Sequence, residues 1–164
     1  AHRLDIATAL LRAGRYDEAV LRARDAVELD IGQDRARATL GWAYLLSGRE
    51  SEGVAELERA VAISPADPLW LSQLGQAYGM AGMPAKAREI LRELEERAQR
   101  AYVSPYHLAY VHTGLGDAER AMDWLERAVA ERTGAAYGIK GSFLFAPLRA
   151  HPRFRALLRQ MNLG

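Results

Sequence analysis

The sequence contains no cysteine, which excludes disulfide bonds, thiolate catalysis and cysteine-ligated metal. An excess of one charge is also lacking, because 22 basic and 21 acidic residues leave a formal charge of +1. Such a balance lacks the positive field that sequence-independent phosphate binding requires, so we expect no nucleic-acid partner. The chain has no apolar run long enough for insertion into a membrane and no signal-peptide layout at its start. These absences predict a cytoplasmic protein.

What the chain does contain is an internal repeat. Similar phrases end in glycines that lie 34 residues apart, at Gly14, Gly48, Gly82 and Gly116. A small residue follows each glycine by five positions, and an apolar residue precedes each by eight. This pattern is typical of an antiparallel helix pair in which small residues let the helices approach and apolar residues build the seam. The sequence therefore predicts an all-α fold of four helical hairpins, with a glycine at each turn.

Helix start and stop signals place the boundaries of the repeats. In the second copy we expect helices over residues 34–46 and 50–63, and Ser64 and Pro65 end the second of them. Asp67–Pro68 and Ser104–Pro105 both combine an N-cap residue with proline at the first helical position. In the third copy the helical spacing continues, which predicts a long second helix from Pro84 to about Ala101. The predicted repeats span about residues 1–33, 34–67, 68–101 and 102–133.

These residues resemble the tetratricopeptide repeat. Its signature positions are matched in the second copy by Leu40, Gly41, Tyr44, Gly53, Ala60 and Pro65. The resemblance covers about residues 1–133 and implies a right-handed superhelical solenoid that binds a protein partner without catalysis. The C-terminal portion is similar to the end of repeat regions in bacterial signalling proteins, which implies a regulatory part of a larger protein.

The two ends of the array depart from the repeat. Residues 134–149 break the period and are expected to form an irregular packed connection. Beyond it, residues 151–164 place apolar side chains on one helical face and arginines on the other, as a capping helix would. These apolar residues are Phe154, Leu157, Leu158 and Met161. At the other end no helix covers the first hairpin, which indicates a fragment and makes self-association through that hairpin an alternative.

The sequence shows no constellation typical of an enzyme. His107 and His112 are five residues apart and diverge around a helix, so no metal or other cofactor is expected. His112 occupies the repeat position of Tyr44 and Tyr78, which favours a core residue. The glycine-flanked Lys140 lacks the spacing of a phosphate loop. A hidden active site in the tail, around residues 137–145, is the enzymatic alternative.

The first helices of tetratricopeptide hairpins line a concave groove. Mapping by the period gives the candidate groove residues Trp42, Leu45, Leu46, Leu69, Ser72, Gln73, Gln76, Met80, Tyr106, His107 and Tyr110. Trp70 and Trp124 are instead expected in the core or between repeats.

Aromatic and apolar side chains with amides favour a protein or peptide partner that contributes apolar side chains, with Trp42, Tyr106 and Tyr110 as anchors. Arg35 is the only cation at the mapped positions, so a carboxylate clamp is not expected. Two hypotheses stay open. The chain is an interaction scaffold with an open groove, or it is a structural or oligomerisation module whose groove is filled by its own residues 137–146.

Overall fold

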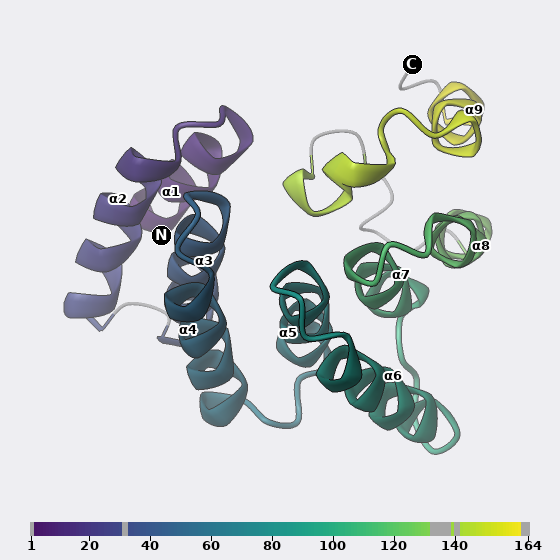
Figure 1. Cartoon of the computed structure of the whole chain (residues 1–164), viewed down its shortest axis with the longest axis horizontal. Helices are drawn as coiled ribbons and strands as arrows, with labels where there is room; N and C mark the ends of the chain where they lie inside the picture. Colours follow the sequence, from purple (N-terminus) through teal and green to yellow (C-terminus); the bar gives the residue numbers. More distant parts are fainter. Residues whose placement is uncertain (1, 31–32, 132–138, 140–141, 162–164) are drawn as a thin grey trace.

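The computed structural model describes residues 2–30, 33–131, 139 and 142–161. Successive helices form antiparallel hairpins that stack into a curved solenoid (Figure 1). The helices are α1 His2–Arg12, α2 Tyr16–Glu28, α3 Gln33–Leu46, α4 Glu50–Ile63, α5 Pro68–Met80, α6 Pro84–Ala98, α7 Pro105–Gly114, α8 Ala118–Ala130, the 3-10 helix η2 Phe143–Leu148 and α9 Pro152–Gln160. Part of the predicted connection, residues 134–138, 140 and 141, lies outside the described residues. None of the described helices is both long and apolar enough to cross a membrane.

Each hairpin turn contains a glycine in the left-handed region of the backbone. The φ angles of Gly14, Gly48, Gly82 and Gly116 are 76°, 91°, 76° and 77°. At such angles a glycine avoids the steric penalty that a Cβ atom would incur. The residue after the glycine closes the turn; the Arg49 amide, for example, donates to the Tyr44 carbonyl over 2.8 Å. The repeated glycine thus sets the end of each first helix through a Schellman motif.

The predicted helix starts are confirmed. Asp67 accepts a hydrogen bond from the amide of Leu69 at 2.9 Å, and Ser104 accepts one from the amide of Tyr106 at 3.3 Å. The predicted end of the long helix is wrong, because α6 ends at Ala98 rather than near Ala101. Ala101 is exposed, so burial on a neighbouring helix does not extend the helix that far.

Small residues bring the helices of the second hairpin together. A Cβ atom on Gly53 would lie 2.6 Å from the carbonyl oxygen of Gly41, which is closer than real Cβ contacts. Around such crossings the apolar side chains form a continuous core from α1 to α7. A second cluster joins α7, α8 and α9 through Phe145, Phe154 and Leu157. The C-terminal helix therefore covers the last hairpin, as the amphipathic pattern predicted.

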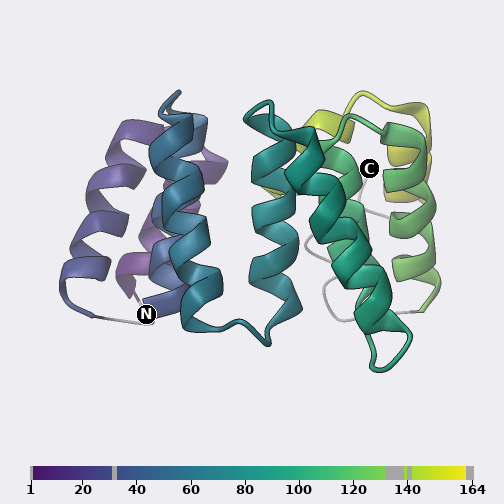
Figure 2. The ribbon, with the colours of Figure 1, turned by 60° about the horizontal axis from the view of Figure 1, so that its bottom comes forward.

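The first helices of consecutive hairpins are not evenly spaced. A Cβ atom on Gly79 of α5 would lie 2.3 Å from the carbonyl oxygen of Gly114 on α7, so these two helices touch through their backbones. In contrast, α3 and α5 meet at few positions, and the chain passes from one to the other through α4. The wider separation of α3 from α5 is visible in Figures 1 and 2. We call the first contact the tight junction and the second the loose junction.

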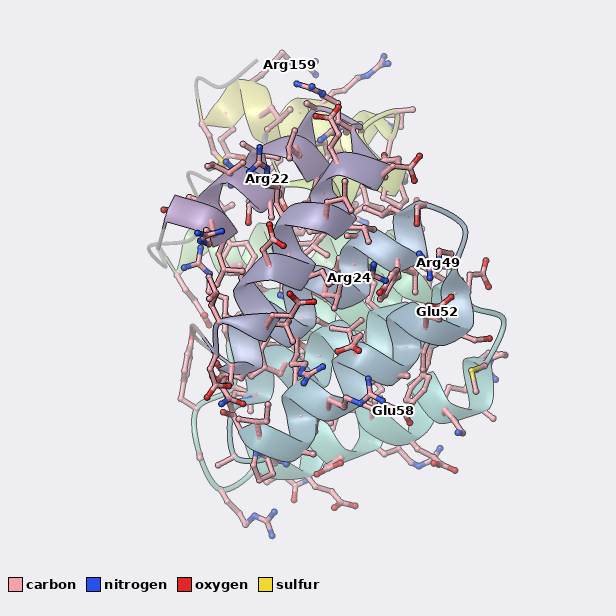
Figure 3. The ribbon with its side chains drawn as sticks, turned by 90° about the vertical axis from the view of Figure 1, so that its left-hand side faces the viewer. Arg22, Arg24, Arg49, Glu52, Glu58 and Arg159 are labelled. Carbon is pink, nitrogen blue, oxygen red and sulfur yellow. The ribbon has the colours of Figure 1, made fainter. Side chains whose placement is uncertain are left out.

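The outer face of the first two hairpins is charged with both signs. Figure 3 shows Arg22, Arg24, Arg49, Glu52 and Glu58 on this face. Arg49 and Glu52 form an ion pair of 2.6 Å within one turn of helix. Charges of alternating sign that are paired in this way are typical of a solvated surface.

Candidate functional site

The concave face carries a cavity of about 440 Å³ beside the loose junction. Its walls come from α1, α3, α5, α7 and the segment that contains η2. Aromatic side chains dominate these walls, with Trp42, Trp70, Tyr110 and Phe143 among them. The stacking of hairpins places α1, α3, α5 and α7 on one face, so residues distant in sequence converge there.

Trp42 lines this cavity and is fixed from two sides. Its side chain is 2% exposed, and its indole Nε1 donates a hydrogen bond of 2.8 Å to Oε1 of Gln73 on α5. The ring of Phe143 meets Trp42 edge to face, with centroids 5.9 Å apart. Trp42 therefore links the second repeat to the third across the loose junction.

The helix η2 occupies the part of the groove that lies over α5 and α7. The side-chain amide of Gln76 donates to the main-chain carbonyl of Leu144 at 2.7 Å. The ring of Phe145 stacks on Tyr110 with centroids 5.0 Å apart and lies 6.4 Å from the ring of Tyr106. Burial raises the pKa of Tyr110 to about 12, so its phenol is neutral at physiological pH. Two of the predicted anchors thus contact the chain's own Phe145.

The structure gathers only part of the predicted groove set around the cavity. Trp42, Gln73, Tyr106 and Tyr110 line it, and Gln76 lies beneath η2.

The other candidates lie elsewhere. Leu45 is buried against Gly53 in the seam between α3 and α4, and the hydroxyl of fully buried Ser72 donates to the Leu69 carbonyl at 2.7 Å. Leu46 and Leu69 are half-buried. Met80 is 38% exposed at the end of α5. Burial lowers the pKa of half-buried His107.

Several cavity residues were absent from the sequence-based set. Thr8 and Thr39 both line the cavity. Each stands 34 residues before a predicted groove residue, Trp42 and Gln73 respectively. Applying the period to the preceding copy would therefore have found them. Trp70, expected in the core or between repeats, links α5 to α3, since its indole Nε1 donates to Asp34 at 3.0 Å, and it also lines the cavity wall.

Asp34 is held in its ionised form beside the cavity. The hydroxyl of Ser64 donates to the Asp34 carboxylate over 2.7 Å. This bond, together with those from the Arg35 amide and the Trp70 indole, outweighs burial and lowers the pKa of Asp34. The carboxylate thus fixes Trp70 on the wall and connects the start of α3 to α5.

The rim of the cavity carries two arginines. Arg12 and Arg35 line it, and none of the described lining residues is a carboxylate. Arg35 forms an ion pair of 3.1 Å with Asp5, both side chains being about half exposed. Arg12 is exposed at the end of α1. Aromatic faces, amides and guanidinium groups can bind a peptide by stacking and hydrogen bonding.

The described residues do not supply a metal centre, since no group of three or more histidine, aspartate or glutamate side chains converges among them. A second cavity of about 500 Å³ lies between α6 and the turn from α7 to α8. His112 contributes to its wall and is 4% exposed, which agrees with the core position predicted for it. Its Nδ1 lies 4.0 Å from the Asp117 carboxylate. Burial nevertheless lowers the pKa of His112, so the ring is neutral near pH 7.

Comparison with known proteins relates the chain to one family. Two profiles described as tetratricopeptide repeat match residues 10–76 and residues 106–132. Curated proteins give no match to the chain.

Solved structures resemble the fold over nearly its whole length. The crystal structure of nearly identical TPR-like repeats assigned to a kinesin light chain of Podosopora anserina has a TM-score of 0.58 at 19% identity, covering 98% of this chain and 92% of that one. A single-substitution variant of the same repeats gives a TM-score of 0.57 at 18% identity, with the same coverage. MamA from AMB-1 has a TM-score of 0.50 at 21% identity and covers 99% of this chain and 92% of its own. At these identities the likeness concerns the fold. The repeat profiles, which agree with the hairpin geometry, identify the chain as a tetratricopeptide repeat protein.

Proposed function

We propose that the chain is a non-catalytic scaffold that binds a peptide or protein segment in its concave groove. Tetratricopeptide repeats mediate protein–protein interactions, and the observation that carries this proposal is the aromatic cavity of about 440 Å³ on the concave face. An apolar side chain of the partner would pack against Trp42. Main-chain groups of the partner would bond to Arg12, Arg35 and other polar side chains of the rim. Such a scaffold would serve as a regulatory part of a larger bacterial protein.

The test blocks the cavity while leaving the fold intact. Peptides are selected from a random library on the wild-type protein, and their affinities are measured by fluorescence anisotropy. Thr8→Trp places a large side chain at the half-buried wall formed by α1, so we expect affinity to fall about ten-fold or more. Ser51→Trp adds the same side chain at an exposed position of α4 and is the matched control. Equal affinities for the two variants would refute binding in the groove.

A second candidate function is a structural or oligomerisation module. Two observations favour it: η2 already fills part of the groove, and the first hairpin exposes large apolar side chains. Leu21 on α2 is 60% exposed, and Leu29, directly after α2, is 53% exposed. Ile6 on α1 is 45% exposed. Light scattering over a range of protein concentrations tests this candidate. If the protein forms dimers and Leu21→Asp dissociates them, this candidate function is supported. If the protein is a monomer at every concentration, the candidate is contradicted.

A further inference from the structure

The segment that occupies the groove has two parts with different roles. Phe145 and Leu148 are each 2% exposed and pack in the cluster of α7, α8 and α9. Leu144 instead belongs to the core formed by the earlier helices, and half-buried Phe143 packs against that core. The C-terminal cluster therefore holds η2 in place, whereas its first two residues reach across to α3 and α5.

The contacts of these two residues are those of a bound peptide. The ring of Phe143 lies edge-on against Trp42, and the main-chain carbonyl of Leu144 accepts a hydrogen bond from the Gln76 amide. A bond to a main-chain carbonyl does not depend on which side chain the bound residue carries. The aromatic contact supplies the selectivity.

The occupied surface also has an unused hydrogen-bonding atom. Gln76 is 1% exposed, and in the described part of the chain its Oε1 is buried without a hydrogen-bond donor. Buried acceptors are nearly always paired, because leaving one unpaired is unfavourable. The chain's own segment thus satisfies only one half of this amide. A peptide that also presents an N–H group to Oε1 would satisfy both.

The occupant can be displaced from the side of the cavity. Phe143 is half-buried and forms part of the cavity wall. The contact between α9 and α8 does not depend on it, since Arg153 bonds at 2.6–2.9 Å to Glu119, Asp123 and Glu126 of α8. Moving Phe143 and Leu144 would therefore leave the C-terminal helix attached, and they would remain at roughly millimolar effective concentration as internal competitors.

We propose that Trp42, Gln73 and Gln76 form a binding subsite for an aromatic side chain and the following peptide carbonyl, which the chain's own Phe143 and Leu144 occupy in this structure. This rests on the proposed function in the groove and defines its partner as a peptide segment with an aromatic residue. Gln73 belongs to the subsite because its side chain fixes the Trp42 indole. Binding of the partner then requires displacement of the internal segment.

The experiment empties the subsite and offers the segment from outside. The probe is a synthetic peptide with the sequence of residues 142–149, blocked at both ends, and the readout is the indole N–H signal of Trp42 in ¹H–¹⁵N spectra of the full chain. The signal is identified by its absence in Trp42→Phe. In Phe143→Ser we expect saturable shifts of this signal, with an affinity about ten-fold tighter than in the wild type. Ala146→Ser, an exposed change in the same helix, should behave as the wild type.

Equal responses of the wild type and Phe143→Ser, or no response of the folded variant, would overturn the subsite. A probe with alanine in place of its first phenylalanine should not bind, and undiminished binding would likewise overturn it. If Phe143→Ser does not fold, Phe143→Leu removes the ring while keeping apolar volume, and the same outcomes apply. If the affinity of the library peptides falls in Thr8→Trp but is the same in Phe143→Ser as in the wild type, the subsite is refuted and the groove function still stands. If their affinity does not fall in Thr8→Trp, the groove function itself is refuted.

Discussion

The tight and loose junctions join the same kind of helix in opposite ways. At the tight junction, glycines remove the side chains between α5 and α7, and the backbones touch. At the loose junction, α3 and α5 are bridged by side chains, chiefly the hydrogen bond from Trp42 to Gln73. The cavity and the internal Phe143 both lie beside the loose junction.

This difference shows how a regular repeat acquires a local site. All four copies keep the same turn glycine, so the hairpins themselves are alike. The residues that face the next hairpin are free to vary, and they decide whether two first helices close or stay apart. A large side chain such as Trp42 bridges the wider gap to α5, and the cavity lies beside it.

The largest expected effect is a difference in the free energy of unfolding between alanine variants of two phenylalanines on η2. Phe145 is 2% exposed on the side of the tight junction, so Phe145→Ala should lower the free energy of unfolding by about 4 kcal/mol. Phe143 is half-buried against Trp42, and Phe143→Ala should cost only about 1 kcal/mol. Urea unfolding followed by circular dichroism measures both. Similar losses for the two variants would mean that Phe143 belongs to the core as fully as Phe145 does.

The next effect concerns the glycine contact itself. Gly79→Val adds atoms where a Cβ would already lie 2.3 Å from the Gly114 carbonyl oxygen, so α5 and α7 must separate. We expect a loss of about 3 kcal/mol in unfolding free energy. The control is Met80→Val, at a 38% exposed position of the same helix, which should change stability by less than about 0.5 kcal/mol. A tolerated Gly79→Val would contradict the distinction between the junctions.

The smallest effect is a dependence of stability on pH that originates in α7. Burial lowers the pKa values of His107 and His112 below the ordinary 6.5. The unfolded chain therefore binds more protons than the folded one, and stability should decline as the pH falls below about 6.5. His112→Phe should flatten the fall in melting temperature between about pH 7 and pH 5. An unchanged slope would mean that the ring of His112 does not resist protonation in the folded protein.

Much of the fold could be predicted from the sequence because the residues that set the helices and turns repeat every 34 positions. The turn glycines and the core position of His112 recur in register, 34 residues apart, whereas Asp67 and Ser104 were recognised from their own capping signals. How closely the first helices of consecutive hairpins approach each other could not be predicted in this way. Gly79 and Gly114 stand at different positions relative to their turn glycines, three and two residues before them, so the repeat does not align them.

The candidate site was predictable only in part, for a related reason. Trp42, Gln73, Tyr106 and Tyr110 were found because they occupy first-helix positions of the repeat. The wall formed by η2 comes from a segment outside the period. The alternative of a groove filled by residues 137–146 named this segment, but no repeat position indicated which side chains Phe143 and Phe145 would contact. Arg12 was missed because the positions equivalent to it hold Leu46 and Met80, which gave no sign of a charged rim.

The most direct test of a binding site at the loose junction is a map of where a bound peptide lies. A library-selected peptide carrying a nitroxide label is added to ¹⁵N-labelled protein, and paramagnetic broadening of the amide signals is measured residue by residue. We predict the strongest broadening around Thr8, Thr39 and Gln73, which line the cavity from three different helices. Broadening centred on the charged outer face of α2 and α4, with these amides unaffected, would contradict the account.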